Sequence, residues 1–304
     1  MIGQTPGVLI LAGPTASGKT ELAVELAERF GAEIVGADSR QIYRGMPIGT
    51  AVPTAAERGR VPHHLVEMLE PTERYSAARF VTDALAAIAA LAARGKRTIV
   101  VGGTGFYVRA LCGDVVLSSA YDPELRARLA REARLHAPAT LHDWLRARDP
   151  ARAADVSPND GYRVLRALEI ALTSGRSTPP PAPASLRSAR ITYAKTFLDL
   201  PGDELRARIG ARVRSMLERG FVEEALRIGP AAVAADAVGY PHAIAYADGA
   251  CTAAELRALL ARETHRYARR QYTWFRSEPA VTWIERRSAP AALHALARKL
   301  PGWG

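Results

Sequence analysis

One eight-residue pattern near the N-terminus constrains this chain more than any other part of its sequence. It fits Gly-x-x-x-x-Gly-Lys-Ser/Thr and consists of Gly13, Pro14, Thr15, Ala16, Ser17, Gly18, Lys19 and Thr20. The apolar run 7–12 before it predicts a buried strand, and the helical spacing of apolar residues across 21–30 predicts a helix after it. A strand, a glycine-rich turn and a helix in this order place backbone N–H groups and the positive end of a helix where they can hold a diphosphate.

The side chains of this pattern suggest the ligand. Lys19 can neutralise the terminal oxygens of a diphosphate, and the Thr20 hydroxyl can ligate Mg²⁺, the one cofactor that we predict. Enzymes that hydrolyse nucleotides normally add an acid at the end of a second strand, which helps to hold the magnesium ion. The strand predicted at 98–101 runs instead into Gly102, Gly103, Thr104 and Gly105. The sequence therefore predicts a loop that binds a diphosphate without hydrolysing a nucleotide.

The remaining pattern alternates strands and helices before and after a purely helical stretch. Such alternation favours a parallel sheet covered on both faces. Strands are predicted at 32–36, 97–101, 194–198 and 281–284, and the main helices at 77–93, 204–219 and 253–276. Residues 118–173 carry helical spacing with no buried strand. The predicted fold class is thus α/β: a parallel-sheet core like that of P-loop NTPases, formed by residues 1–117 and 190–304, with an inserted helical subdomain at 118–189.

Charge bears on the partners of the chain. The net charge is +10, of which residues 1–100 carry +1 and residues 101–304 carry +9. The second part is suited to a polyanion. However, 37 of the 41 basic residues are Arg, so a genome rich in Arg codons explains the excess equally well.

Hydrophobicity and cysteine content exclude some classes of protein. The longest apolar run, 84–93, is far shorter than the roughly 20 residues of a bilayer span, and the N-terminus has no secretion pattern. Two cysteines make a disulfide framework or structural zinc site improbable. We therefore expect a cytoplasmic protein with no membrane association.

Asp38 directly follows the second predicted strand. Ligands of open α/β sheets bind at this edge, so Asp38 should lie beside the phosphate loop. A carboxylate there can act as a general base, as an outer-shell magnesium ligand or as a helix cap. Ser39, Arg40 and Gln41 add hydrogen-bond donors, and Gln can pair bidentately with adenine.

Several motifs in a fixed order carry a resemblance. They are Gly13 to Thr20, Ala37 to Ala51 (ADSRQIYRGMPIGTA), Val61 to Leu65 (VPHHL), Tyr75 to Phe80 (YSAARF), Gly102 to Tyr107 (GGTGFY), Asn159 to Glu169 (NDGYRVLRALE) and Arg269 to Arg276 (RRQYTWFR). Together they resemble the tRNA dimethylallyltransferase family, from the first strand to the last long helix.

The resemblance implies an enzyme, with a donor, an acceptor and catalytic roles. The family transfers the isopentenyl group of dimethylallyl diphosphate to N6 of adenosine 37 in tRNAs that read codons beginning with U, and releases pyrophosphate. By this resemblance Asp38 takes the proton from the N6 amine, and Thr104 is a positioning donor. An Arg of the helix 206–212 completes the diphosphate clamp, with Arg208 and Arg212 as the candidates.

The resemblance also implies that tRNA is a partner, since the acceptor base must leave the anticodon-loop stack to reach the pocket. The residues expected to contact tRNA are Asp38, Ser39, Arg40, Gln41, Thr104, Arg126, Tyr162, Arg163 and Arg166. Arg163 and Arg166 share a helix face at i, i+3 spacing, although a solvated helix face is the alternative for any such cluster. We expect a monomer that binds the anticodon stem-loop.

One motif departs from the family, and three other functions compete. Gly239-Tyr240-Pro241-His242 stands where the family usually has Gly-Tyr-Arg-Gln, so an Arg and a Gln expected near the tRNA are replaced. The first competitor is an adenylate isopentenyltransferase that uses free AMP, ADP or ATP. The second is a small-molecule kinase with ATP in the same loop, and the third is a non-catalytic RNA-binding protein.

Overall fold

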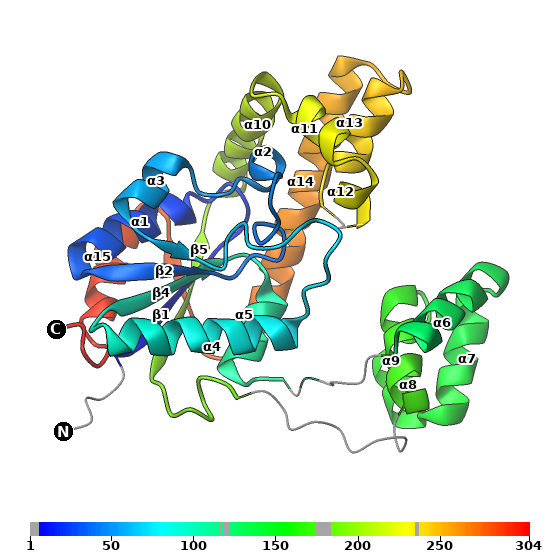
Figure 1. Ribbon diagram of the computed structural model, residues 1–304, viewed down its shortest axis with the longest axis horizontal. Helices are drawn as coiled ribbons and strands as arrows, with labels where there is room; N and C mark the ends of the chain where they lie inside the picture. The colour runs from blue at the N-terminus through cyan, green and yellow to red at the C-terminus, as the bar shows by residue number, and fades with distance from the viewer. Residues whose placement is uncertain (1–5, 116, 118–121, 174–183, 235–236) are drawn as a thin grey trace. The chain divides into compact units, whose positions relative to one another are not determined.

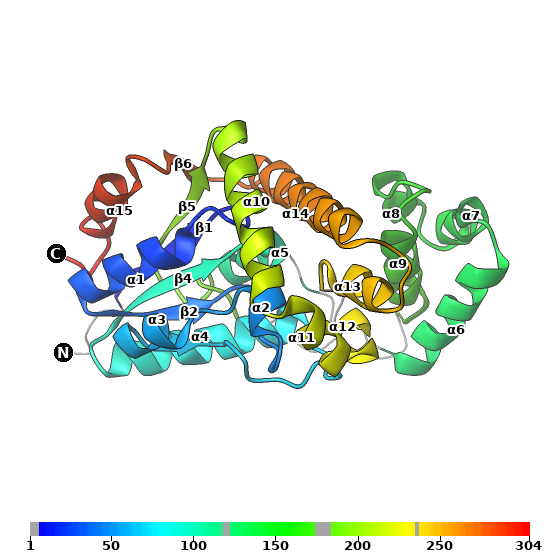
Figure 2. The same ribbon diagram turned by 90° about the horizontal axis from the view of Figure 1, so that it is seen from above.

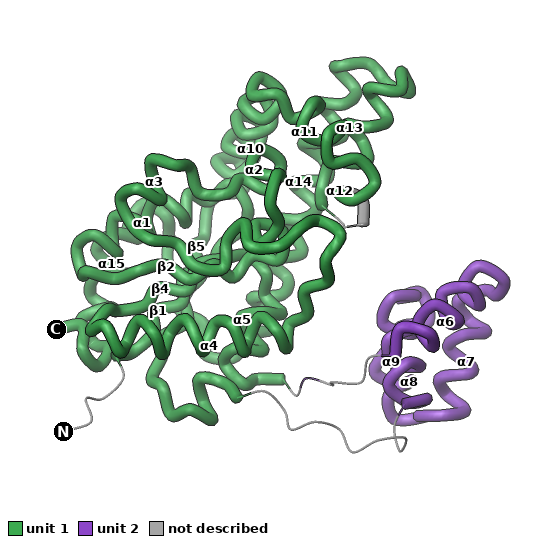
Figure 3. Tube along the Cα trace, in the orientation of Figure 1, with its two compact units in different colours: residues 1–115, 184–304 green, residues 116–183 purple. Residues whose placement is uncertain are grey.

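The computed structural model describes residues 6–115, 117, 122–173, 184–234 and 237–304. The chain forms two compact units, which Figure 3 distinguishes by colour. Unit 1 comprises Met1–Val115 and Ala184–Gly304, and unit 2 comprises Val116–Pro183. Each unit is described by itself below.

Unit 1 is built on a six-stranded sheet whose order is β3-β2-β4-β1-β5-β6. Every neighbouring pair is parallel, and the central register places Val8 beside Thr98 and Tyr193. The strands are β1 (Val8–Ala12), β2 (Ala32–Gly36), β3 (His63–His64), β4 (Arg97–Gly102), β5 (Tyr193–Asp199) and β6 (Val281–Glu285). The predicted parallel α/β fold is confirmed.

Helices cover both faces of this sheet, which is why its central strands are almost continuously apolar. All residues of β1 and β2 are buried. In Figures 1 and 2, α1 (Lys19–Phe30) and α15 (Ala289–Ala297) lie on one face, and α4 (Ala77–Ala93) and α5 (Gly105–Cys112) on the other. The predicted helices and strands of the core are confirmed to within two residues at each end.

A group of helices extends from the sheet edge at which the strands end (Figures 1 and 2). They are α10 (Gly202–Glu218), α11 (Phe221–Ile228), α12 (Pro230–Ala234), α13 (Tyr240–Ala247) and α14 (Ala253–Arg276). Two short helices, α2 (Pro47–Thr50) and α3 (Ala55–Arg60), precede β3. The buried Phe221 and Tyr240 join these helices to the main core, with ring centroids 5.0 Å apart.

Unit 2 is a small helical body with its own core. Its helices are α6 (Pro123–Leu135), α7 (Pro138–Arg148), α8 (Pro150–Asp155) and α9 (Gly161–Thr173). Leu129, Leu145, Val164 and Leu168 meet at its centre. The described part of the predicted insertion is thus helical, and the Pro-rich stretch 177–185 lies mostly outside the described residues.

The return from unit 2 differs from the predicted boundary at residue 190. Residues 184–189 belong to unit 1, because Leu186 is fully buried and its N–H donates to the Leu111 carbonyl at 2.8 Å. Arg187 forms an ion pair with Asp114, which also pairs with Lys195 at 2.7 Å. Among the described helices, none combines the length and apolar character needed to cross a membrane.

Candidate functional site

The phosphate loop joins β1 to α1 at the edge where the strands end. Its backbone turns through left-handed conformations at Ala16 (φ 65°) and Gly18 (φ 80°). The Ser17 N–H donates to the Pro14 carbonyl at 3.2 Å, and the Lys19 ammonium donates to the same carbonyl at 3.4 Å. Helix α1 begins at Lys19, so its positive end faces the loop.

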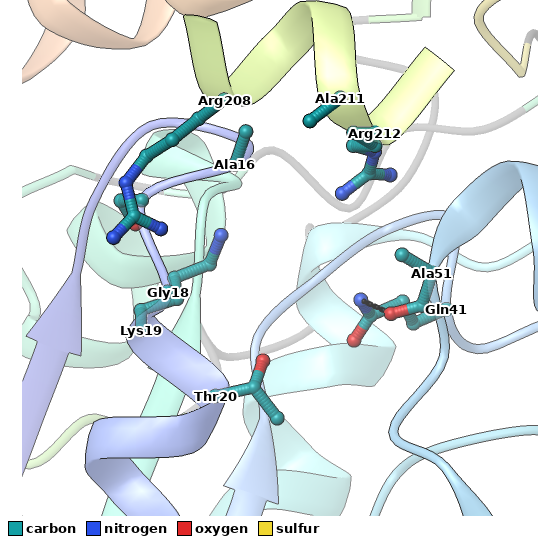
Figure 4. Close-up of a pocket in the computed structure, with 10 residues that line it drawn as sticks. Ala16, Gly18, Lys19, Thr20, Gln41, Ala51, Arg208, Ala211 and Arg212 are labelled. Carbon is teal, nitrogen blue, oxygen red and sulfur yellow. Dashed lines mark hydrogen bonds between the residues drawn. The ribbon is translucent and has the colours of Figure 1, made fainter. Parts of the chain in front are cut away.

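A cavity of about 350 Å³ lies against this loop. It is lined by Ala16, Ser17, Gly18, Lys19, Thr20, Gln41, Ala51, Arg208, Ala211 and Arg212. Figure 4 shows the Lys19 ammonium and the Arg212 guanidinium directed into it, with the Thr20 hydroxyl beside them. Among these described lining residues are three cations and no carboxylate, which suits a compact polyanion such as a diphosphate.

Helix α10 supplies the two arginines, one helical turn apart. Arg208 donates to Glu204 at 3.1 Å, and its Nη1 lies 3.6 Å from the position that a Cβ would take at Gly18. Arg212 donates to the Gly49 carbonyl at 3.4 Å. The sequence predicts that one of these two arginines completes the diphosphate clamp, without deciding which. The structure places both of them at the cavity.

The cations of the site interact with one another. Burial lowers the pKa of Lys19 to about 8, the negative charge of Asp38 opposes this shift, and the nearby Arg212 adds to it. Burial likewise lowers the pKa of Arg212. A bound anion would relieve both effects, because it compensates the desolvated positive charges.

Asp38 and Thr104 meet at the ends of β2 and β4. The Thr104 N–H donates to the Ala37 carbonyl at 3.3 Å, and the Thr104 Oγ1 accepts the Ser39 N–H at 3.0 Å. Asp38 Oδ1 accepts the Arg40 N–H at 2.9 Å, so the carboxylate also stabilises its own turn. The structure therefore brings Asp38, Ser39, Arg40 and Thr104 together beside the phosphate loop, as the sequence predicted.

Gln41 lies in the wall of the cavity. Its Nε2 donates to the Thr50 carbonyl at 3.2 Å and to the Ala51 carbonyl at 2.8 Å. Figure 4 shows the bond to Ala51. The two bonds use both hydrogens of the amide. Bidentate pairing with adenine, which needs one amide donor and the amide oxygen, would require one of them to break.

Helix α14 and the residue that follows β6 add three side chains that the sequence did not predict. The Tyr267 hydroxyl interacts with Thr104, and burial, with the charge of Asp38, raises the pKa of that hydroxyl. Gln271 reaches the phosphate loop, as described below. Arg286 donates to the Ser17 carbonyl at 3.1 Å. Tyr267 and Gln271 stand four residues apart in a long helix, and this spacing was the one signal available in the sequence.

The remaining predicted tRNA contacts lie in unit 2. Arg126 on α6 and Arg166 on α9 both reach Oε2 of Glu169, at 3.5 and 2.8 Å, and Glu169 is 1% exposed. Arg163 pairs with Asp160 at 3.3 Å. Tyr162 is 75% exposed. These four side chains belong to one compact helical body, separate from the unit that carries the phosphate loop.

The departure at 239–242 fits the fold locally. Gly239 (φ 93°) precedes α13, and Pro241 occupies the first turn of that helix, where an N–H has no helical partner in any case. The Tyr240 hydroxyl donates to Glu224 at 2.7 Å inside the core. The replacement therefore removes a basic side chain without disturbing the helix start.

The donors at the cavity fit a magnesium ion that arrives with its ligand. Mg²⁺ usually keeps several waters and binds through one or two protein oxygens together with substrate phosphates. The Thr20 hydroxyl at the cavity is an oxygen of that kind. In the described part of the chain, no three His, Cys, Asp or Glu side chains converge into a protein-only metal site.

The parallel sheet and the loop at its edge define the class of protein: a P-loop α/β fold with a cavity lined by cationic side chains. The IPP transferase family model matches residues 41–278, and the isopentenyl transferase model matches residues 6–62. The chain therefore belongs to the IPP transferase family.

Known proteins agree with this membership. A tRNA dimethylallyltransferase from Anaeromyxobacter dehalogenans is 48% identical over 96% of this chain and 98% of its own length. The solved tRNA isopentenylpyrophosphate transferase of Bacillus halodurans is 35% identical, with a TM-score of 0.68 over 95% of each chain. A eukaryotic dimethylallyltransferase solved acting on tRNA shares the fold, at 24% identity and a TM-score of 0.76, and the match covers 95% of this chain and 77% of that one.

Proposed function

We propose that this protein transfers the dimethylallyl group of dimethylallyl diphosphate to N6 of adenosine 37 in tRNAs that read codons beginning with U. Pyrophosphate is the second product. The observation that carries the proposal is the placement of Asp38 beside a cavity whose charged groups are all cations. Membership of the IPP transferase family supports it.

In this proposal the cavity stabilises the leaving group. The donor's C1–O bond breaks as the N6–C1 bond forms, and the diphosphate carries away the bonding electron pair. Lys19, Arg208 and Arg212 compensate the charge that develops on the departing oxygens. The Thr20 hydroxyl would hold Mg²⁺ together with the diphosphate, and the ion would supply further positive charge to the leaving group.

Asp38 serves the acceptor. The lone pair of the N6 amine is delocalised into the purine ring, so attack requires removal of a proton. The carboxylate of Asp38 takes that proton, while the Arg40 N–H and the Thr104–Ser39 bond hold the turn in place. Thr104 and Tyr267 adjoin this turn and help to position the base.

The tRNA is bound through its anticodon stem-loop, and the adenine is extruded before it reacts. Arg126, Arg163 and Arg166 contact the phosphate backbone, and Tyr162 lies beside them. Ser39 and Arg40 face the acceptor base and its neighbours. We propose that the enzyme acts as a monomer in the cytoplasm.

The acceptor distinguishes this proposal from an adenylate isopentenyltransferase. Label transfer from radioactive dimethylallyl diphosphate with Mg²⁺ is measured on unmodified tRNA with the loop sequence A36-A37-A38, on the same tRNA with A37→G, and on AMP. The proposal predicts labelled tRNA, and no label on the A37→G tRNA or on AMP. Label on AMP alone would establish the alternative acceptor, and label on neither would refute prenyl transfer to adenine.

A further inference from the structure

One side chain connects the phosphate loop to the loop that presents Thr104. The Oε1 of Gln271 accepts the Thr15 N–H at 2.8 Å, and its Nε2 donates to the Gly103 carbonyl at 3.0 Å. Gln271 is 4% exposed. The two loops follow different strands, β1 and β4, and one carboxamide occupies the space between them.

The Gln271 amide packs closely against the backbone at Gly103. A Cβ at Gly103 would lie 2.0 Å from Gln271 Nε2 and 3.3 Å from the Gly13 carbonyl oxygen. Glycine at position 103 is therefore what allows the amide to approach the backbone. A buried N–H or carbonyl without a partner costs about 1–3 kcal/mol, so loss of the amide would leave two such groups and free both loops to shift.

Helix α14 presents this residue as part of a stripe. Tyr267, Gln271 and Trp274 follow one another at i, i+4 and i+7, so they share a face. Tyr267 interacts with Thr104, Gln271 donates to the Gly103 carbonyl, and the Trp274 ring would meet a Cβ at Gly105 at 2.1 Å. Three successive residues of the β4–α5 turn thus each contact one residue of α14. Of these three α14 residues, Gln271 also accepts a hydrogen bond from the phosphate loop.

We propose that Gln271 is a positioning residue for group transfer: its carboxamide fixes the phosphate loop relative to the loop that carries Thr104. The distance between the leaving group and the acceptor base is then set by α14. Gln271 accepts the Thr15 N–H, so this N–H is not available to a bound diphosphate. The diphosphate would then be bound by the N–H groups of the loop that are nearer to α1. The role in turnover rests on the proposed function, whereas the role in diphosphate binding does not.

The test compares Q271M, which keeps the length but loses both hydrogen bonds, with T273A, an exposed position on the same helix. Inorganic pyrophosphate binding is measured by calorimetry, tRNA binding by filter retention, and unfolding by a thermal melt. For Q271M we expect a pyrophosphate Kd about tenfold higher and a kcat about tenfold lower, with the tRNA Kd within twofold of wild type. T273A should match wild type in pyrophosphate Kd, tRNA Kd, melting temperature and the kcat of label transfer.

A second variant provides a readout that a purely structural residue would not give. Q271E keeps an acceptor for the Thr15 N–H but can donate to the Gly103 carbonyl only when its carboxyl is protonated. Its kcat relative to wild type should therefore rise as the pH is lowered from 8 to 6, whether or not Q271M folds. A ratio that stays constant with pH would overturn the proposal.

Two further results would also contradict it. One is pyrophosphate affinity and kcat within twofold of wild type in both variants. The other is an equal loss of pyrophosphate and tRNA affinity in step with the melting temperature, which would make Gln271 a folding residue. Failure of the proposed function is distinct, because wild type would then transfer no label to tRNA while the pyrophosphate comparison would still report on the loop.

Discussion

The Thr104 hydroxyl oxygen accepts the backbone N–H of Ser39 at 3.0 Å, and this bond ties the end of β4 to the turn that holds Asp38. The two residues are 65 positions apart in the chain and follow β2 and β4, which are neighbouring strands of the sheet. The position of the Asp38 turn therefore depends on a side chain that itself carries no charge.

Removing this hydroxyl should slow the reaction. In T104V the Ser39 N–H loses its partner, which removes a bond worth about 1–1.5 kcal/mol. The turn that holds Asp38 is then less firmly fixed. We expect kcat for tRNA to fall about tenfold, with a smaller change in KM for dimethylallyl diphosphate. T104S keeps the hydroxyl and should retain most activity. Equal rates in T104V and wild type would show that the bond has no role in catalysis.

The lowered pKa of Lys19 makes diphosphate binding depend on pH. In the free protein this amine loses its proton above a pKa of about 8, and a bound diphosphate raises that pKa. Binding therefore takes up a proton above pH 8, and the affinity of wild type should fall by up to about tenfold per pH unit there.

K19R provides the control, because a guanidinium stays charged over this range. Titration of the ligand itself affects both proteins equally. The ratio of the wild-type Kd to the K19R Kd should therefore rise between pH 8 and 9.5 in calorimetry with dimethylallyl diphosphate. A constant ratio would rule out titration of Lys19 in the free site.

Much of this architecture could be predicted because its signals are local. The apolar run of β1, the mostly apolar residues of β2 and the loop between Gly13 and Thr20 can be recognised in the sequence, and so can the long helices. The two-residue strand β3 has too little periodicity to detect, and residues 184–189 join unit 1 through contacts of Leu186 that only the tertiary structure shows. Tyr267, Gln271 and Arg286 were missed for the same reason: each acts on a loop more than 160 positions away.

A buried carboxylate, that of Glu224, holds the backbone of the segment that precedes Ala51 in the cavity wall. Glu224 is 1% exposed and accepts the N–H groups of Ile48 and Gly49 at 2.9 and 2.8 Å, together with the Tyr240 hydroxyl. E224A leaves these donors buried without partners, so we expect unit 1 to lose about 3 kcal/mol of unfolding free energy. Chemical denaturation measures this, with the exposed neighbour variant E223A as control. A stability equal to that of E223A would contradict the assignment.

The arginines of unit 2 should contribute to RNA affinity through phosphate contacts. R163A should raise the tRNA Kd about fivefold and reduce the slope of log Kd against log salt concentration by about 0.7 to 1. Arg134, exposed at the end of α6, has no assigned RNA contact, so R134A is the matched control. The same loss in both variants would indicate a nonspecific effect of charge, and no loss in R163A would remove it from the interface.

The central claim is that Asp38 removes the proton from the acceptor amine beside the cationic cavity. The most direct measurement is single-turnover prenyl transfer by D38N on saturating tRNA and dimethylallyl diphosphate at pH 7.5, with binding of each substrate measured separately. The account predicts a rate lower by about 10² to 10⁴, with both affinities within a few fold of wild type. A D38N enzyme that transfers the group at close to the wild-type rate would contradict it.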